Sequence, residues 1–189
     1  MNNKFNRWVW PSLLNKEQIS EINKLARDNF FKKELFEEGA HDINGQMKKN
    51  SDVSYVMLED MNGKLDNCIN EAYHIHDIYF AYNLYRRNPL EHIFYNVYDS
   101  KNKSKYDWHI DKSEYDLMDI KLTLLINVSE EPYEGGIFSM RSTNINEIPE
   151  FSEPGSMIMF QSHIDHQVSP IITGVRKTIT YFMKGPRFV

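Results

Sequence analysis

Two residues near the middle of the chain have side chains and a spacing suited to binding a metal ion. His109 and Asp111 lie two positions apart, directly after the aromatic residues Tyr106 and Trp108. Because alternate side chains of a β-strand point to the same face, an imidazole and a carboxylate at this spacing can hold one ion from one side. A third ligand must then come from a neighbouring strand.

A second histidine further along the chain could complete the set. His163 and His166 both qualify by residue type. His166 is favoured because Gln167 to Pro170 continues it as a strand, whereas His163 lies in the preceding loop. Two imidazoles and one carboxylate with open coordination positions form the ligand set of non-haem Fe(II) oxygenases. Structural zinc sites are mostly closed by Cys and His, and this chain has only Cys68.

An arginine ten residues after His166 suggests what else the site binds. Arg176 follows the turn between Pro170 and Gly174. Two antiparallel strands joined by this turn would bring His166 and Arg176 to the same depth in a barrel. A guanidinium there can hold a distal carboxylate by a two-pronged hydrogen bond. The pattern predicts an iron site that binds a 2-oxoacid with two carboxylates.

Other histidines and tyrosines offer weaker alternatives. A second His-x-Asp pair, His163 and Asp165, is more simply a surface or turn pair, and His74 and His76 lack a nearby carboxylate and arginine. His41 and His92 form no pattern. Two tyrosines, Tyr98 and Tyr106, could donate a hydrogen bond to a bound carboxylate, although ordinary aromatic packing is the favoured explanation in a chain with 11 tyrosines, more so for Tyr106 than for Tyr98.

Composition limits the class of protein. The chain has 189 residues, a hydrophobic fraction of 41% and a net charge of −5, which fit one globular domain without a basic surface for nucleic acid. No apolar run is long enough to span a membrane, and the first 20 residues have no signal-peptide pattern. A single cysteine excludes an internal disulfide and favours a cytoplasmic location. We expect a monomer.

The first third of the chain has helical patterns. From Lys16, apolar residues recur every three or four positions to Phe30, which predicts an amphipathic helix. A second helix is predicted over residues 59–74, and the polar residues 40–52 are typical of a loop. We therefore expect residues 1–76 to form a helical support region.

The remainder, residues 77–189, has the pattern of a β-rich catalytic core in the same single domain. Short strands are predicted over 78–86, 92–98, 119–128, 135–140, 156–160, 167–171 and 176–183. Strands of this length separated by turns favour a jelly roll, a double-stranded β-helix of the cupin-like kind. The polar segments 99–105 and 112–118 flank the predicted metal strand. We expect both to hold substrate, and 99–105 to act as a lid.

Several motifs in this half, taken together and in order, resemble a known family. They are Tyr98, the segment from Tyr106 to Asp111, Tyr133-Glu134-Gly135-Gly136, the segment from Pro154 to Ser162, the segment from His166 to Ile171, Gly174-Val175-Arg176 and Gly185-Pro186-Arg187-Phe188. The combination is similar to the prolyl 4-hydroxylase type of 2-oxoglutarate/Fe(II)-dependent dioxygenases. The similarity covers about residues 90–189, and the N-terminal helices fit more loosely.

The resemblance implies roles for individual residues. His109, Asp111 and His166 would bind Fe(II), and Arg176 would hold the C5 carboxylate of 2-oxoglutarate. Tyr98 stands where the family has a tyrosine that contacts this cosubstrate. Some relatives add a tyrosine from the strand after the His-x-Asp loop, where this chain has Thr123 as a possible replacement. Ascorbate often supports such enzymes as a reductant.

The reaction implied is hydroxylation of a C–H bond by O2, with 2-oxoglutarate converted to succinate and CO2. The leading hypothesis is an enzyme that acts on a prolyl residue in a peptide or protein partner. One alternative is a hydroxylase of a free amino acid or another small molecule. A nucleic-acid dealkylase is disfavoured because the chain lacks basic surface and a second downstream arginine motif. A metal-free jelly-roll binding module is the remaining alternative.

Overall fold

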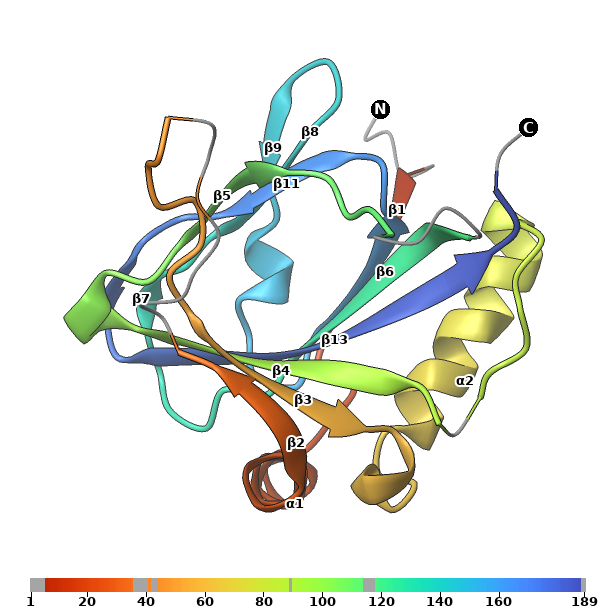
Figure 1. Cartoon of the computed structure of the whole chain (residues 1–189), viewed down its shortest axis with the longest axis horizontal. Helices are drawn as coiled ribbons and strands as arrows, with labels where there is room; N and C mark the ends of the chain where they lie inside the picture. The colour runs from red at the N-terminus through yellow and green to blue at the C-terminus, as the bar shows by residue number, and fades with distance from the viewer. Residues whose placement is uncertain (1–5, 36–40, 42–43, 89, 114–117, 188–189) are drawn as a thin grey trace.

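The computed structural model describes residues 6–35, 41, 44–88, 90–113 and 118–187. Two antiparallel sheets face each other, and the helices lie outside the larger one (Figure 1). The larger sheet has the order β1 (Arg7–Trp10), β10 (Met157–Gln161), β6 (Asp119–Asn127), β13 (Val175–Gly185), β4 (His92–Asp99), β3 (Asp52–Met57) and β2 (Phe30–Glu34). The smaller sheet has the order β5 (Tyr106–His109), β11 (Asp165–Val168), β8 (Phe138–Arg141) and β9 (Ile145–Glu147). The predicted mainly β, jelly-roll fold with helices near the N-terminus is confirmed.

The two faces of strand β6 are buried in two different hydrophobic clusters. Leu122, Leu124 and Ile126 are fully buried in the cluster that contains the helices. Leu125 belongs instead to a second cluster, which lies between the two sheets, and Thr123 faces the same side. Alternate residues of a strand point to opposite faces, so this strand is covered on both sides. Its interior face carries Thr123 toward the site described below.

The first helix agrees with its prediction. Helix α1 (Lys16–Asp28) begins at Asn15, whose side chain accepts a hydrogen bond from the Gln18 amide while the Gln18 side chain bonds back to Asn15. Such reciprocal capping satisfies amide groups that the first turn would otherwise leave free. The helix ends before Phe30, where β2 starts, because apolar residues beyond this point pair with β3 instead.

The second predicted helix is interrupted. Residues 59–74 divide into a short 3₁₀ turn, η3 (Glu59–Met61), and helix α2 (Asp66–Ile75). Asn62 and Gly63 between them have positive φ values of 48° and 73°, a conformation that ends a right-handed helix. The apolar stripe continues across the break, which is why its spacing suggested one helix.

Strands also occur where only helices were expected. Three of the seven strands of the larger sheet, β1, β2 and β3, come from residues 1–76. The boundary between a helical support region and a β core at residues 76 and 77 is therefore not observed. Val53 and Val56 of β3 are buried, but the strand is too short for its pattern to stand out beside the polar residues before it.

The prediction of a strand over 78–86 is wrong. His76–Phe80 form a single π-helical turn, η4, that continues α2 and ends at Ala81 with a φ of 50°. The chain then runs without regular structure through residue 88, along the yellow-green segment beside α2 in Figure 1. The amide of Tyr85 donates to the carbonyl of Lys184 at 2.8 Å, while Tyr82 and Leu84 pack against the helix-side core. Packing rather than strand pairing accounts for these aromatic residues.

The other predicted strands are found, with two divided. Residues 135–140 are split between β7 (Glu134–Gly135) and β8, since Gly136 has a φ of 60°. Residues 167–171 are split at Pro170, which lacks an amide hydrogen, into β11 and β12 (Ile171–Thr173). No helix in the described ranges is long and apolar enough to cross a membrane.

The predicted hairpin that joins His166 to Arg176 is also wrong. The break at Pro170 sends the two residues into different sheets: His166 on β11 pairs with His109 on β5, and Arg176 on β13 pairs with Tyr98 on β4. The short strand β12 between them pairs with β7. His166 and Arg176 still meet in one cavity, but they reach it from facing sheets rather than from one hairpin.

Candidate metal centre and its cavity

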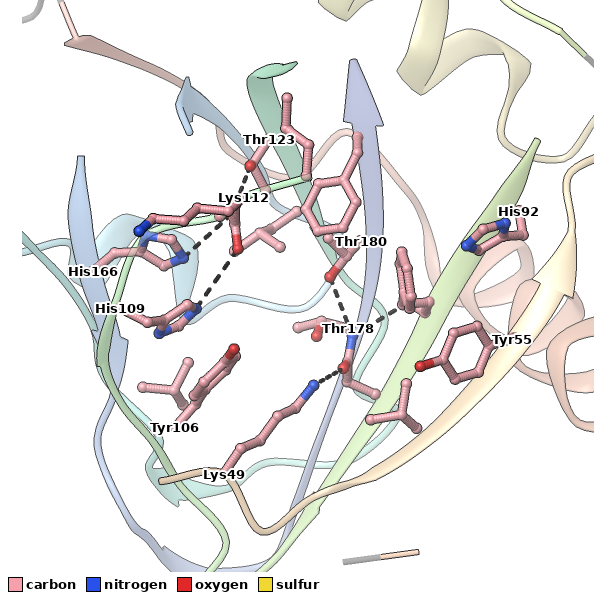
Figure 2. A pocket seen from close by; sticks show the side chains of 18 of the residues that line it. Lys49, Tyr55, His92, Tyr106, His109, Lys112, Thr123, His166, Thr178 and Thr180 are labelled. Carbon is pink, nitrogen blue, oxygen red and sulfur yellow. Dashed lines mark hydrogen bonds and ion pairs between the residues drawn. The ribbon is translucent and has the colours of Figure 1, made fainter. Parts of the chain in front are cut away.

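Three side chains come together at one end of the space between the sheets. A ligand atom from each of His109, Asp111 and His166 lies within 4.8 Å of the others. His109 Nε2 is 3.7 Å from Asp111 Oδ1, and His166 Nε2 is 3.5 Å from Asp111 Oδ2 (Figure 2). Two imidazoles and a carboxylate at these separations could hold one metal ion. This grouping matches the sequence-based prediction, and it is the only such group in the part of the chain that the structure describes.

The antiparallel pairing of β5 with β11 brings the two imidazoles together. His109 is the last residue of β5, and His166 is its direct partner in the antiparallel register. Each ring has its Nδ1 on a carbonyl of its own chain segment, that of Asp107 at 2.7 Å and that of Ile164 at 2.9 Å. A carbonyl can only accept, so each Nδ1 carries the hydrogen and each Nε2 presents its lone pair to the centre. Both rings are therefore in the orientation and tautomer that could bind a metal ion.

Asp111 is oriented by a chain of hydroxyl groups. Its Oδ2 accepts a hydrogen bond from Thr123 Oγ1 at 2.6 Å, and Thr123 Oγ1 is 2.9 Å from Ser162 Oγ. Since the single Thr123 proton goes to the carboxylate, the Ser162 hydroxyl must donate to Thr123. The Asp111 amide also donates to the Ser162 carbonyl at 3.0 Å. These bonds hold the carboxylate just beyond the end of β5.

The surroundings keep His109 uncharged. The Tyr106 ring stacks on the His109 ring at a centroid distance of 3.4 Å and an interplanar angle of 13°. Burial, and then the nearby His166, lower the pKa of His109 to about 2, against a raising contribution from its bond to Asp107. The imidazole is therefore neutral at pH 7, which is the form that binds a metal.

A cavity of about 820 Å³ opens beside these three residues. It is lined by side chains from both sheets, among them Arg176. Arg176 is 1% exposed as a residue, and its buried Nε and Nη2 have no hydrogen-bond partner. Its Cζ lies 5.5 Å from the Tyr98 ring and 5.4 Å from the Phe151 ring. A buried cation with unused donors is costly unless an anion pairs with it, so the cavity suits a carboxylate at this depth.

Tyr98 lies beside this guanidinium. It is buried, lines the same cavity and is the direct register partner of Arg176 across β4 and β13. Burial raises the pKa of Tyr98, while Arg176 acts in the opposite direction. The phenol is therefore a neutral hydrogen-bond donor at pH 7.

The competing candidates are placed elsewhere. His163 is exposed in the turn before β11, and Asp165 forms an ion pair with Arg141 on the outer side of the smaller sheet. His74 is exposed on α2, and His76 is bound to Asp77 and to the Tyr82 carbonyl. His92 lines the outer part of the cavity among aromatic rings, and His41 is exposed.

The segment that was expected to act as a lid forms a hydrogen-bonded turn and does not cover the cavity. Within residues 99–105, η5 (Ser100–Asn102) forms a 3₁₀ turn, and Ser100 and Ser104 bond to Gly174 and Ile171. None of these residues lines the cavity described above. In the other flanking segment, Lys112, Ser113 and Met118 do line it, and residues 114–117 lie outside the described residues.

Sequence reasoning missed three polar residues of this region. Ser162 completes the hydroxyl chain to Asp111, and Lys49 and Asn96 bond to each other in the cavity at 3.1 Å. Ser162 could have been found from its place directly after the buried strand β10. Lys49 could not, because it lies in a polar loop far from the motif in sequence.

The chain was compared with known proteins to interpret this geometry. Residues 93–184, which include all three metal-site residues and Arg176, match the model of the 2OG-Fe(II) oxygenase superfamily. Residues 93–184 thus resemble a 2OG-Fe(II) oxygenase domain. A search of curated proteins by sequence finds no match. The predicted resemblance and the prediction of an oxidoreductase of this class are confirmed, and the family implies Fe(II) and 2-oxoglutarate as its cofactor and cosubstrate.

Several solved structures have a similar fold, and the similarity extends over nearly the whole chain. A viral collagen prolyl hydroxylase from Paramecium Bursaria Chlorella virus-1, in a 2OG complex, is 14% identical with a TM-score of 0.69, covering 97% of this chain and 98% of that chain. A prolyl-4-hydroxylase from Pseudomonas putida is 13% identical with a TM-score of 0.68, covering 97% and 94%. A prolyl hydroxylase from Trichoplax adhaerens, in complex with a hypoxia inducible factor peptide fragment, is 13% identical with a TM-score of 0.68, covering 96% and 84%. At these identities the likeness establishes a shared fold.

Proposed function

We propose that this protein is a hydroxylase that acts on a prolyl residue of a peptide or protein. His109, Asp111 and His166 bind Fe(II), and Arg176 binds the C5 carboxylate of 2-oxoglutarate. One observation carries this proposal: a buried guanidinium with unused donors lines the same cavity as three convergent metal-ligand atoms. A dianion that is held by iron at one end and by Arg176 at the other would satisfy both.

The residues of the chain bind, orient and shield. Bound iron would supply the chemistry that couples decarboxylation of 2-oxoglutarate to insertion of one oxygen atom of O2 into a C–H bond. Tyr98 donates to the cosubstrate beside Arg176. Thr123 has its proton on Asp111, so we assign it to orienting that carboxylate rather than to the cosubstrate contact expected from the sequence.

Support for a prolyl substrate comes from the solved structures of similar fold. One of them is a viral collagen prolyl hydroxylase, and another was solved with a peptide fragment of hypoxia inducible factor. The cavity of this chain also suits a peptide, since its outer part is lined by the aromatic rings of Tyr55, Phe94 and Phe182. Extended proline-rich segments bind such aromatic surfaces because little conformational entropy is lost on binding.

The proposal is tested by incubating the protein with Fe(II), 2-oxoglutarate and a panel of proline-containing peptides. Each peptide is paired with a control in which alanine replaces the proline. A +16 Da product from a proline peptide but not from its control, with an equal amount of succinate, is the expected result. Omitting ascorbate in parallel tests its role as a reductant. Absence of product from every prolyl peptide would refute prolyl specificity.

A free amino acid or other small molecule is the second candidate, favoured by the size of the cavity. About 820 Å³ is within the range of pockets that enclose small ligands. Free amino acids tested under the same conditions distinguish the candidates, because a +16 Da product from one of them, without any from peptides, selects the small-molecule reaction.

A further inference from the structure

A lysine outside the metal motif reaches into the cavity from the segment between β2 and β3. Lys49 forms an isolated antiparallel bridge with Tyr106 of β5, so its backbone is fixed beside the metal strand. Its side chain is half-buried and lines the cavity. Figure 2 shows it extending from below Tyr106 toward Thr178 on the opposite sheet. The ammonium group thus lies inside the cavity, between Tyr106 and the larger sheet.

This ammonium group is positioned by a neutral partner. Lys49 Nζ donates to Asn96 Oδ1 at 3.1 Å, and the Asn96 amide is itself fixed by Thr180 Oγ1 at 3.1 Å and the Phe94 carbonyl at 3.2 Å. Among the residues that the structure describes, no carboxylate forms an ion pair with Lys49. Lys32 and Lys105 nearby differ, because they pair with Glu34 at 2.6 Å and Asp107 at 2.8 Å. The Lys49 charge is held in place but is not neutralised.

The site of 2-oxoglutarate proposed above does not need this charge. Arg176 is deeper, beside Tyr98 and Phe151, and supplies unused donors for the C5 carboxylate. Lys49 is separated from the metal ligands by an aromatic ring: Tyr106 stacks on His109 at 3.4 Å, and Lys49 Nζ lies 4.9 Å from the Tyr106 centroid. In Figure 2, Tyr106 lies between the other two residues. Arg176 and Lys49 are therefore separate cationic positions in a cavity that three other lysines also line, namely Lys32, Lys112 and Lys184.

Beyond Lys49 the cavity wall becomes aromatic. Phe94 lies 5.0 Å from Tyr55, 5.0 Å from His92 and 5.2 Å from Phe182, measured between ring centroids. These rings come from three adjacent strands of the larger sheet and line its outer cavity. A ligand that extends outward from the metal would pass a fixed cation and then an apolar surface.

We infer that Lys49 binds an anionic group of the primary substrate and so selects a prolyl peptide with a carboxylate close to the target proline. The inference rests on the proposed function for the peptide part, since the carboxylate belongs to an Asp or Glu side chain beside that proline. Among the described residues, Glu34 and Asp111 are the carboxylates that line this cavity. Neither forms an ion pair with Lys49, so an incoming carboxylate would gain a charge-assisted hydrogen bond.

The test compares binding of peptides that differ only in charge. Each peptide contains one proline. The two peptides of a pair differ at a single position, which carries Glu in one and Gln in the other. Separate pairs place this change at each of the two positions before the proline and each of the two positions after it. Binding is measured by calorimetry with protein loaded with Mn(II) and 2-oxoglutarate, which keeps turnover out of the measurement. At one or more positions, the wild-type protein should bind the Glu peptide roughly tenfold more tightly or better. Lys49→Met should remove this preference, and Lys49→Arg should retain most of it.

Lys33→Met is the matched control, because it also removes one positive charge from the β2 region. Lys33 pairs with Asp52 at 3.6 Å and does not line the cavity, so its variant should keep the preference for Glu. Equal binding of Glu and Gln peptides at all positions by the wild-type protein would overturn the inference. So would a preference that persists in Lys49→Met, or an equal loss of both peptides, which would mean that Lys49 only supports the segment between β2 and β3.

Failure of the proposed function has a different signature. With Fe(II) enzyme, peptides that become oxidised without any preference for Glu refute the role of Lys49 alone. Peptides that bind with that preference but are never oxidised refute the prolyl reaction alone. Absence of binding by every acidic peptide counts against the role of Lys49 in peptide selection.

Discussion

His109 and His166 are direct partners across the β5 and β11 pair, with ring centroids 4.1 Å apart. The two histidines are 57 positions apart in the chain, so their meeting depends on strand register. A shift by one residue would turn one ring to the other face of the sheet. Hydrogen bonds from both Nδ1 atoms to backbone carbonyls then aim the Nε2 atoms at Asp111.

Replacement of Asp111 should abolish metal binding under ordinary conditions. Asp111→Ala removes the only carboxylate of the three-residue group, so both iron content after purification and 2-oxoglutarate-dependent succinate release should fall to background. Metal analysis and a succinate assay measure this. His163→Ala is the control, since His163 is exposed outside the group. Normal succinate release from Asp111→Ala would remove this residue from the metal site.

Loss of Arg176 should weaken the binding of 2-oxoglutarate while leaving the fold intact. Removing a charged partner from a buried ion pair costs roughly 2–5 kcal/mol of binding, which corresponds to a 30-fold or greater rise in the Kd for 2-oxoglutarate in Arg176→Met. Because the guanidinium has unpaired buried donors in the ligand-free protein, the variant without ligand should be at least as stable as the wild type. Titration of 2-oxoglutarate and thermal unfolding check the two parts.

The control for this prediction is Arg87→Met, which removes an ion pair with Asp66 away from the cavity. It should leave the affinity for 2-oxoglutarate unchanged. If Arg176→Met unfolds at a clearly lower temperature than the ligand-free wild type, the guanidinium has a structural partner, and its assignment as an anion site is refuted.

Breaking the hydrogen-bonded chain from Ser162 through Thr123 to Asp111 should lower the affinity for the metal without removing a ligand. Thr123→Val keeps the shape of the side chain but deletes the 2.6 Å hydrogen bond to Asp111. Groups that orient metal ligands typically contribute about 10–100-fold to metal affinity or activity, so a fall of this size in Fe(II) affinity is expected. Ser162→Ala should produce a smaller fall. Thr173→Val, on an exposed position of β12, should have no effect.

The preference of wild-type protein for an acidic peptide should depend on pH through Lys49. Burial lowers the pKa of Lys49 to about 8, while Asp111 and Glu34 act to raise it; Asn96 and the Tyr106 ring are its uncharged neighbours. The side chain is charged below this pKa, so the preference should be full near pH 6.5 and decline as the pH rises past about 8. A bound carboxylate favours the charged form and shifts the decline to higher pH. A preference that grows above pH 9 would contradict the role of Lys49.

The sequence predicted which residues come together better than it predicted the path of the chain. Residue types and spacing identified His109, Asp111 and His166, because a strand presents alternate side chains on one face wherever it lies in the fold. The hairpin used to connect His166 with Arg176 was wrong, since Pro170 ends one strand and sends the chain to the other sheet. Both residues nevertheless line one cavity.

Other errors arose where packing outweighs local pattern. The pattern of 78–86 resembles a strand, but Phe80, Tyr82 and Leu84 pack on the helix-side core and the segment forms no strand. Strand β3 pairs with β4, and β2 joins the larger sheet through β3, so both depend on partners that the local pattern does not show. Lys49 is the clearest case of a cavity residue that the sequence does not reveal, since its partners Tyr106 and Asn96 are distant in the chain.

The three metal-site residues and Arg176 reach the cavity from different structural layers. His109 and His166 belong to the smaller sheet, and Arg176 belongs to the larger one. A dicarboxylate that is bound by the metal at one end and by Arg176 at the other would link the smaller sheet to the larger one. Saturation with 2-oxoglutarate in the presence of Mn(II) should therefore slow the parting of the sheets, seen as slower amide hydrogen exchange in β11 and β13 together. A shorter monocarboxylate, which cannot bridge this distance, should protect β11 alone.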